Sequence, residues 1–357
     1  MHDNWAEIAG DSSWSWKGMQ QYYEKFQTVQ RREQSQDGIV QAPTNGPIQA
    51  SYPRRLNKLQ TTWREAFQAL NSFYDSYALD GIAIGGSLTT NAIDGRDGKG
   101  ERSHAGKAYL QPASARKNLT IVTEVLVKKI VFENATSDKN KLRATGVVVE
   151  KDGLSISVSA QREVVLSAGV FGSPQLLELS GIGSKDILEK AGVQCLLHLP
   201  SIGENLQDHL NFGPSVQVQS TVETVDERVR DKAIAKAVQA EYDANRTGML
   251  SEGGVYTFAY WPLQLFETSS ERDELLELTQ KDDTELAPLT KMQFEFNKRM
   301  ILHSKEASAN VALVPRQRHM RPEDDSGGNY MTLLAMLSHP YSRGSSHITT
   351  SDSTVQP

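Results

Sequence analysis

The sequence predicts an α/β protein (α+β overall), and three features of the chain support this. Residues 163–169 pass from an apolar run into small residues, and a helix-forming segment follows, which is typical of a strand–turn–helix unit. Residues 145–150 and 154–160 meet at Asp152-Gly153, a strong hairpin signal. Residues 226–245 place apolar side chains at helical spacing. A chain of 357 residues with these elements can bury a sizeable core in two or three domains.

The first hundred residues are predicted to be helices joined by polar loops. Residues 18–30 and 56–77 carry aromatic and aliphatic side chains three and four positions apart. Residues 81–106 are rich in glycine and are expected to form a solvated loop before a helix over 105–113. This loop is not a P-loop, because Gly100 is followed by Glu101, and not a calcium loop, because its twelfth position is Ala105.

Strands are expected over most of the remaining chain. Besides the hairpin, the β-branched residues of 118–132 predict a strand. We also expect strands at 291–299, 330–337 and 345–349.

The strand–turn–helix unit is the part of the sequence that carries chemistry. A strand buried on both faces is expected to end at Ser167-Ala168-Gly169, where small residues allow close approach to the backbone. Ser173 is then a natural N-cap, Pro174 fits the first turn, and Gly181 ends the helix. Free N–H groups and a positive helix end would meet at one place, which suits a nucleotide or its pyrophosphate. Many crossovers are capped in this way without binding anything, so the pattern alone leaves both interpretations open.

Composition excludes several other classes. The net charge of −6 provides no basic field for nucleic acid. No apolar run approaches the length of a membrane span, and the first thirty residues contain no signal-peptide core, so a cytoplasmic location is expected for the chain as given. The lone cysteine, Cys195, excludes an intrachain disulfide and a cysteine-based zinc cluster.

The residues from Gly169 to Gly183 read Gly-x-x-Gly-Ser-Pro-x-Leu-Leu-x-x-Ser-Gly-Ile-Gly. This run resembles the second signature of the glucose–methanol–choline (GMC) oxidoreductase family of flavoenzymes. Further segments resemble that family in the same order along the chain, namely Trp14-Ser-Trp16 with Tyr22-Tyr23, residues 116–125, residues 199–209, residues 339–348 and residues 354–357. Val170 departs from the pattern, because the family usually has Ala, Ser or Thr there.

The resemblance implies a partial FAD-binding, Rossmann-like domain and a substrate domain with an antiparallel sheet and helices. The implied domains are an N-terminal helical approach segment over 1–55, the FAD-binding part over 56–210, and the substrate domain over 211–357. The implied activity is oxidation of a small-molecule alcohol, with hydride transfer to flavin N5. By the same analogy, Val125 contacts the adenine through its backbone, while Ser167, Ala168 and Gly169 line the adenosine side of FAD.

Two parts of the family's machinery are not found in this sequence, so we expect a chain truncated at both ends. No Gly-x-Gly-x-x-Gly run exists, and the family's catalytic His segment should follow residues 355–357. His339-Pro340 resembles a structural strand entry, His209 is interpreted as a structural histidine, and His104 and His347 as isolated ones. No catalytic residue is therefore assigned.

Two alternatives remain open. The first is a catalytically inactive, truncated GMC-like protein, and the second is a nucleotide-binding module unrelated to flavin. The substrate alcohol, the electron acceptor and the oligomeric state have no signature in the sequence.

Overall fold

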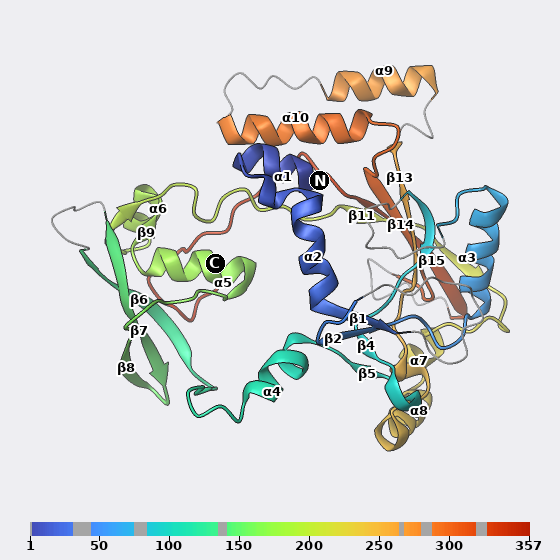
Figure 1. The fold of residues 1–357 in the computed structure, drawn as a ribbon, viewed down its shortest axis with the longest axis horizontal. Helices are drawn as coiled ribbons and strands as arrows, with labels where there is room; N and C mark the ends of the chain where they lie inside the picture. Colours follow the sequence, from blue (N-terminus) through green and yellow to red (C-terminus); the bar gives the residue numbers. More distant parts are fainter. Residues whose placement is uncertain are drawn as a thin grey trace. The chain divides into compact units, whose positions relative to one another are not determined.

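A computed structural model of the chain describes residues 2–30, 44–74, 84–134, 141–263, 268–279, 288–318 and 327–357. The chain folds into two compact units, each built from two separate segments (Figure 1). Unit 1 comprises Met1–Arg116 and His209–Tyr341, and unit 2 comprises Lys117–Asp208 and Ser342–Pro357. The mixture of helices and antiparallel sheets confirms the predicted fold class.

Unit 1 is centred on an antiparallel sheet with the strand order β11-β15-β14-β13-β3, and β12 also pairs with β15. The bounds of these strands are β3 Gly85–Leu88, β11 Asn211–Phe212, β12 Ser215–Val218, β13 Thr257–Trp261, β14 Ala309–Val314 and β15 Asn329–Leu337. Helix α3 (Lys58–Ala69) packs on this sheet through Leu59 and Trp63, which form a core with Ala259 and Leu313. An antiparallel sheet of this kind was expected for the segment beyond residue 211.

The other elements of unit 1 are short strand pairs and helices. The strand pairs are β1 (Gln27–Gln30) with β2 (Ile48–Ser51), which is parallel, and β4 (Ile93–Asp94) with β5 (Glu101–Arg102). The helices are α1 His2–Ala9, α2 Trp16–Phe26, α4 Gln111–Ala113, α7 Asp226–Arg230, α8 Lys232–Asn245, α9 Ser269–Leu278 and α10 Pro288–Leu302, with single turns at Ser12–Trp14, Arg96–Gly98, Gly106–Leu110 and Met249–Ser251.

Unit 2 contains a three-stranded meander of β6 (Leu126–Asn134), β7 (Leu142–Lys151) and β8 (Leu154–Ser159). Helix α5 (Gly169–Leu179) lies against β6, and the Ser180 hydroxyl after it accepts a hydrogen bond from the Ile130 N–H at 2.8 Å. A parallel pair of β9 (Ile182–Gly183) and β10 (Leu197–His198) and helix α6 (Lys185–Lys190) complete the unit.

The predicted hairpin is confirmed. Lys151 pairs with Leu154 across a two-residue loop, and Asp152 and Gly153 have φ angles of 52° and 77°. Positive φ at both central residues is what a type I′ turn requires. The helix end at Gly181 is also confirmed, with a φ of 86° and an N–H that bonds to the Glu178 carbonyl at 2.9 Å.

The buried strand predicted at 163–169 is wrong. Residues 163–168 are not in a strand, and Val165 is 76% exposed. A central parallel strand needs neighbours on both edges, and no described strand pairs with this segment. Helix α5 starts at Gly169, earlier than predicted. Ser173 is therefore not its N-cap, and Pro174 lies inside the helix.

Three further strand predictions differ from the structure. Residues 118–125 precede the strand that was expected to include them, because β6 starts at Leu126. Residues 291–299 lie in the helix α10, where Phe294, Asn297 and Ile301 are buried at helical spacing. Residues 345–349 form no strand, although Gly344 makes a single bridge with Leu206.

Several predicted helices are shorter than expected. The helix at 18–30 ends at Phe26, and 27–30 form β1. The helix at 226–245 is interrupted at Asp231, whose carboxylate accepts hydrogen bonds from the N–H groups of Ala233 and Ile234 and so starts α8. The helix at 56–77 covers Lys58–Ala69, and its expected last residues, 75–77, lie outside the described residues.

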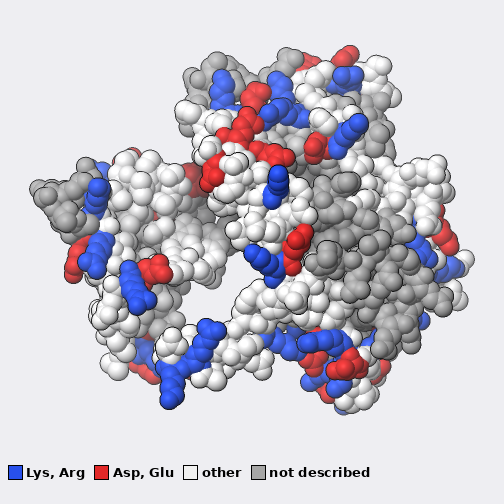
Figure 2. Space-filling view, in the orientation of Figure 1, with Lys and Arg blue, Asp and Glu red and all other residues white. Residues whose placement is uncertain are grey.

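Lys and Arg lie among Asp and Glu on the face of the molecule that Figure 2 shows, in keeping with a net charge of −6. None of the described helices is long and apolar enough to span a bilayer.

Candidate functional site

The predicted site residues Ser167, Ala168 and Gly169 lie directly at the start of α5. The Ala168 N–H donates to the Ser173 hydroxyl at 3.2 Å, so this serine holds the turn from inside the helix instead of capping it. Gly169 has a φ of 85°, a left-handed conformation that favours glycine. A Cβ added there would meet no atom within 4 Å, so the space beside this turn is open.

Unit 2 has a cavity of about 530 Å³ next to this turn. Its walls come from the meander, from the segment before α5, and from α5 itself. The lining residues are Leu126, Val127, Ile130, Val147, Val164, Val165, Leu166, Ser167, Ala168, Gly172, Gln175, Leu176, Leu179 and Ser353. Two of the predicted site residues, Ser167 and Ala168, thus line this cavity.

Val125 and Gly169 do not line the cavity, but each is the chain neighbour of a residue that does. Val125 precedes Leu126, and Gly169 follows Ala168. Of the four predicted residues, Ser167 and Ala168 thus line the cavity, and Val125 and Gly169 do not. Val170, the departure from the family pattern, is 62% exposed and does not line this cavity.

The cavity is apolar apart from a few uncharged polar groups. The side-chain amide of Gln175 already makes a hydrogen bond within the protein, because its Nε2 donates to the Val355 carbonyl at 2.7 Å. The Ser353 hydroxyl is buried and has no hydrogen-bond partner among the described residues. A flat apolar ring with polar edges matches such a lining, and the volume is within the range of small-molecule sites.

The start of α5 adds a place for negative charge. No side chain caps this N-terminus, and the first N–H groups of a helix have no partner inside the helix. The helix dipole adds partial positive charge at the same end. An adenosine in the cavity with its pyrophosphate at the start of α5 would satisfy both features, so the residues present fit the adenosine half of FAD.

The lining residues contain no His, Asp, Glu, Lys, Cys or Tyr. Such a wall can bind and orient a molecule, but it has no group to take a proton at neutral pH. Among the residues that line this cavity, none is suited to acid–base chemistry at neutral pH.

The sequence analysis missed a carboxylate–imidazole–carboxylate cluster in unit 2. His347 Nδ1 lies 2.7 Å from Oε1 of Glu178, and Nε2 lies 3.0 Å from Oε1 of Glu204. Glu178 is fully buried and also accepts a hydrogen bond from the Ile348 N–H at 2.9 Å. Burial alone would lower the pKa of His347, but the hydrogen bonds to both carboxylates outweigh it and raise this pKa above its ordinary value.

His347 is therefore not the isolated histidine that was expected. The one signal in the sequence is Glu178, a charged residue within the apolar run of α5, which needs a partner if the helix packs. The cluster ties α5 to residues 342–357 and supports the cavity indirectly, through the helix that forms its wall.

Two of the other histidines considered earlier, His209 and His339, lie in unit 1. Nδ1 of His209 bonds to the Leu337 carbonyl at 2.9 Å. His339 is 7% exposed beside the Phe296 ring, and its burial lowers its pKa. Neither lines the cavity of unit 2.

Comparison with known proteins identifies related chains. Residues 1–211 match the family model described as GMC oxidoreductase. Versicolorin B synthase from Aspergillus parasiticus is 30% identical over 367 aligned positions, which cover 100% of this chain and 52% of the relative. Patulin synthase from Penicillium expansum is 28% identical, with 100% and 54% covered. The chain thus spans about half the length of the curated relatives it matches.

Solved structures show the same fold at lower identity. An FAD-dependent oxidoreductase from Chaetomium thermophilum has a TM-score of 0.79 and 23% identity, covering 100% of this chain and 60% of the other. A fungal aryl-alcohol oxidase has a TM-score of 0.73 and 22% identity, with 100% and 61% covered. The family whose N-terminal model matches uses FAD, as the resemblance implied. The chain belongs to the GMC oxidoreductase family.

Proposed function

We propose that this chain holds the adenosine side of FAD in the cavity of unit 2, and that the protein oxidises an alcohol. The observation that carries the proposal is the joining of an apolar cavity to the uncapped N-terminus of α5 at Ser167 and Ala168. FAD, when bound, supplies the acceptor at flavin N5 for the hydride of the alcohol carbon.

The chain's own residues bind and orient. Leu126, Val127 and Leu166 offer apolar contacts to the adenine. The Val125 backbone, next to Leu126 in the chain, is kept as a proposed contact to the adenine. Ser167 and Ala168 have small side chains that leave space for the ribose, because larger side chains at these positions would enter the cavity. The open turn at Gly169 leaves the first N–H groups of α5 accessible to the pyrophosphate.

A small-molecule alcohol is the proposed substrate. One structural relative is named an aryl-alcohol oxidase, and the relatives also include a formate oxidase. The division into 1–55, 56–210 and 211–357 is kept as a proposal for functional segments, alongside the two compact units.

Titration with nucleotides tests the site. The purified chain is titrated with FAD, ADP and FMN by isothermal calorimetry. Because the proposed site takes the adenosine half of FAD, FAD and ADP should bind with Kd values within about tenfold of each other, and FMN should not bind at this site. Binding of FMN, or failure of FAD to bind, overturns the proposal.

A matched pair of substitutions locates the site. Ser167→Leu places a large side chain in the cavity wall, whereas Ser157→Leu makes the same change at an exposed position of β8. Ser167→Leu should weaken ADP binding by about tenfold or more, which corresponds to roughly 1.4 kcal/mol. Equal affinities of the two variants would place the nucleotide elsewhere.

A second candidate function is the alternative that the sequence leaves open. This chain by itself would be a catalytically inactive, FAD-binding product of the family. Turnover of an aryl alcohol with a dye acceptor separates the two, because a general base contributes about 10²–10⁴ in rate. FAD binding with no turnover supports the inactive form, and turnover by this chain excludes it.

A further inference from the structure

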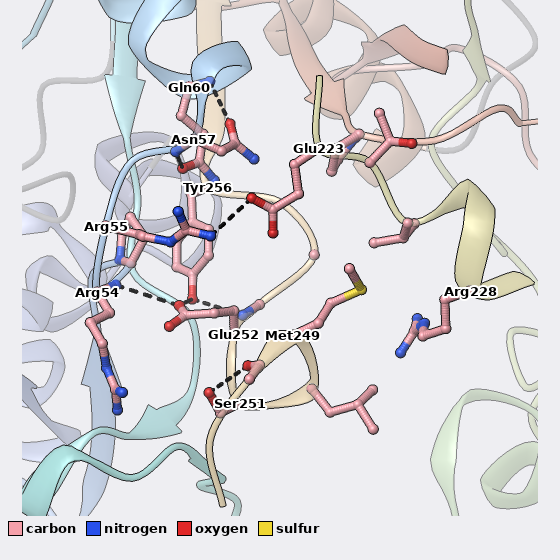
Figure 3. A pocket seen from close by; sticks show the side chains of 18 residues that line it. Arg54, Arg55, Asn57, Gln60, Glu223, Arg228, Met249, Ser251, Glu252 and Tyr256 are labelled. Carbon is pink, nitrogen blue, oxygen red and sulfur yellow. Dashed lines mark hydrogen bonds and ion pairs between the residues drawn. The ribbon is translucent and has the colours of Figure 1, made fainter. Parts of the chain in front are cut away.

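Unit 1 contains a cavity of about 390 Å³ that has no part in the proposed FAD site. Residues 53–60, 223–228 and 248–256 form its walls, together with Pro315 (Figure 3). Five of the lining side chains are charged, and the balance among them decides which ligand the cavity can take. They are Arg54, Arg55, Glu223, Arg228 and Glu252.

Both carboxylates of the wall are already engaged. Glu223 pairs with Arg55 at 3.0 Å. Glu252 accepts a hydrogen bond from the Tyr256 hydroxyl at 3.1 Å, and that hydroxyl in turn accepts from the Gly253 N–H at 2.7 Å. Tyr256 is 1% exposed, so this arrangement is fixed from inside the unit.

The arginines differ from one another. The Arg54 guanidinium donates to the Gly98 carbonyl, and Arg55 pairs with Glu223. Arg228 makes no hydrogen bond or ion pair with any residue that the structure describes. Figure 3 shows it extending from α7 towards Met249, with no dashed line to a neighbour.

The position of Arg228 is set by a buried anchor at the start of α7. Asp226 is 5% exposed and accepts hydrogen bonds from the Thr224 hydroxyl at 2.9 Å, the Gln317 N–H at 2.8 Å and the Tyr330 N–H at 2.8 Å. The backbone that carries Arg228 is therefore held against the sheet, and little of it remains to be ordered when a ligand binds.

The wall also has apolar members, namely Val225, Met249, Leu250 and Pro315, which share it with polar residues such as Thr224 and Ser251. A guanidinium is a planar fork that matches a carboxylate with two parallel hydrogen bonds. An apolar wall beside it selects a ligand whose anionic group is attached to an apolar body.

We propose that this cavity binds a small monocarboxylate with an apolar or aromatic body, its carboxylate on Arg228 and its body against Met249 and Leu250. The site is distinct from the proposed FAD cavity, because all of its residues belong to unit 1 and those of the other to unit 2.

Benzoate is the probe, and isothermal calorimetry with the full chain is the assay. Benzoate should bind, while the neutral isostere benzamide and inorganic phosphate should bind at least about tenfold more weakly, because each lacks one of the two features recognised. No benzoate binding overturns the proposal. If benzamide binds with the same affinity as benzoate, the cavity does not recognise the carboxylate charge. If phosphate binds with the same affinity as benzoate, the cavity does not recognise the apolar body.

The matched variants are Arg228→Gln and Arg230→Gln, on the same helix but with only Arg228 in the wall. Arg228→Gln should weaken benzoate by about tenfold or more, Arg230→Gln should leave it unchanged, and Arg228→Lys should be intermediate because it keeps charge without the fork. Benzoate affinity unaffected by Arg228→Gln, or reduced equally by Arg230→Gln, overturns the assignment. A circular dichroism spectrum and a urea unfolding midpoint that match the unsubstituted chain show that the Arg228 variants are folded.

Discussion

Replacing His347 by alanine is the most informative perturbation of unit 2. Among the described residues, the His347 imidazole is the only side chain that hydrogen-bonds the fully buried Glu178 carboxylate. After the substitution, Glu178 would retain the hydrogen bond from the Ile348 N–H and lose its ionic partner. A buried carboxylate without a partner is costly, so the change is expected to destabilise unit 2.

The size of the loss follows from burial. Breaking a buried ion pair from one side costs about 3–5 kcal/mol. The Glu178 side chain is 0% exposed, but that of His347 is 17% exposed, so water reaches the imidazole side. We therefore expect the lower end, about 3 kcal/mol, for His347→Ala. Glu178→Gln keeps an acceptor for the Ile348 N–H and should cost less, about 1–2 kcal/mol.

The assay is urea unfolding at pH 6, followed by circular dichroism, with His104→Ala as the control because His104 is exposed. The double variant that combines His347→Ala with Glu178→Gln should be more stable than the sum of the two single losses, since its neutral amide leaves no buried charge unpaired. A loss below about 1 kcal/mol for His347→Ala, or strictly additive losses, would refute the reasoning.

Three other predictions concern the same unit. Because the pKa of His347 is raised, the stabilising effect of its protonated form is complete below the unfolded pKa of about 6.5 and is lost as pH rises through the folded pKa. The Tm of the unsubstituted chain should therefore fall as pH rises above about 6.5. His347→Ala should make this fall smaller. Gly181→Ala should cost more than about 2 kcal/mol in urea unfolding, because φ is 86° and a Cβ would lie 2.6 Å from the Gln194 carbonyl oxygen. Gly192→Ala, with φ of 75° and nothing within 4 Å, should cost only about 1 kcal/mol, and equal losses would contradict the steric part. Leu188→Ala removes a side chain that is 0% exposed and should cost about 2–5 kcal/mol by the same measurement, and a smaller loss would mean that the site collapses around the cavity.

The sequence predicted those elements that local chemistry decides. The hairpin at Asp152-Gly153 and the helix end at Gly181 depend on positive φ angles that a few residues determine by themselves. Residues 163–168 were predicted wrongly because a buried strand depends on neighbours that local sequence does not contain. Residues 291–299 were predicted wrongly because their alternating pattern also fits a helix, in which Phe294, Asn297 and Ile301 share the buried face.

The candidate site divides in the same way. Ser167 and Ala168 could be found because a small-residue turn before a helix is a local pattern, and both line the cavity of unit 2. The partnership of His347 with Glu178 could not, because 169 positions separate the two residues. Arg228 gives no signal in the sequence, since only the fold shows that the neighbouring carboxylates are engaged with other groups.

The interleaving of the two units has a consequence for the order in which the protein matures. A small core of unit 2 joins Leu188 and Ala191 to Ile348, so it closes only after the whole second segment of unit 1 has been synthesised. Until then α5 exists without the residues that hold Glu178. Contacts across so long a stretch of chain form slowly, and the waiting segment exposes apolar surface. The late capture of residues 342–357 by unit 2 is thus a step at which a chaperone would protect exposed apolar surface.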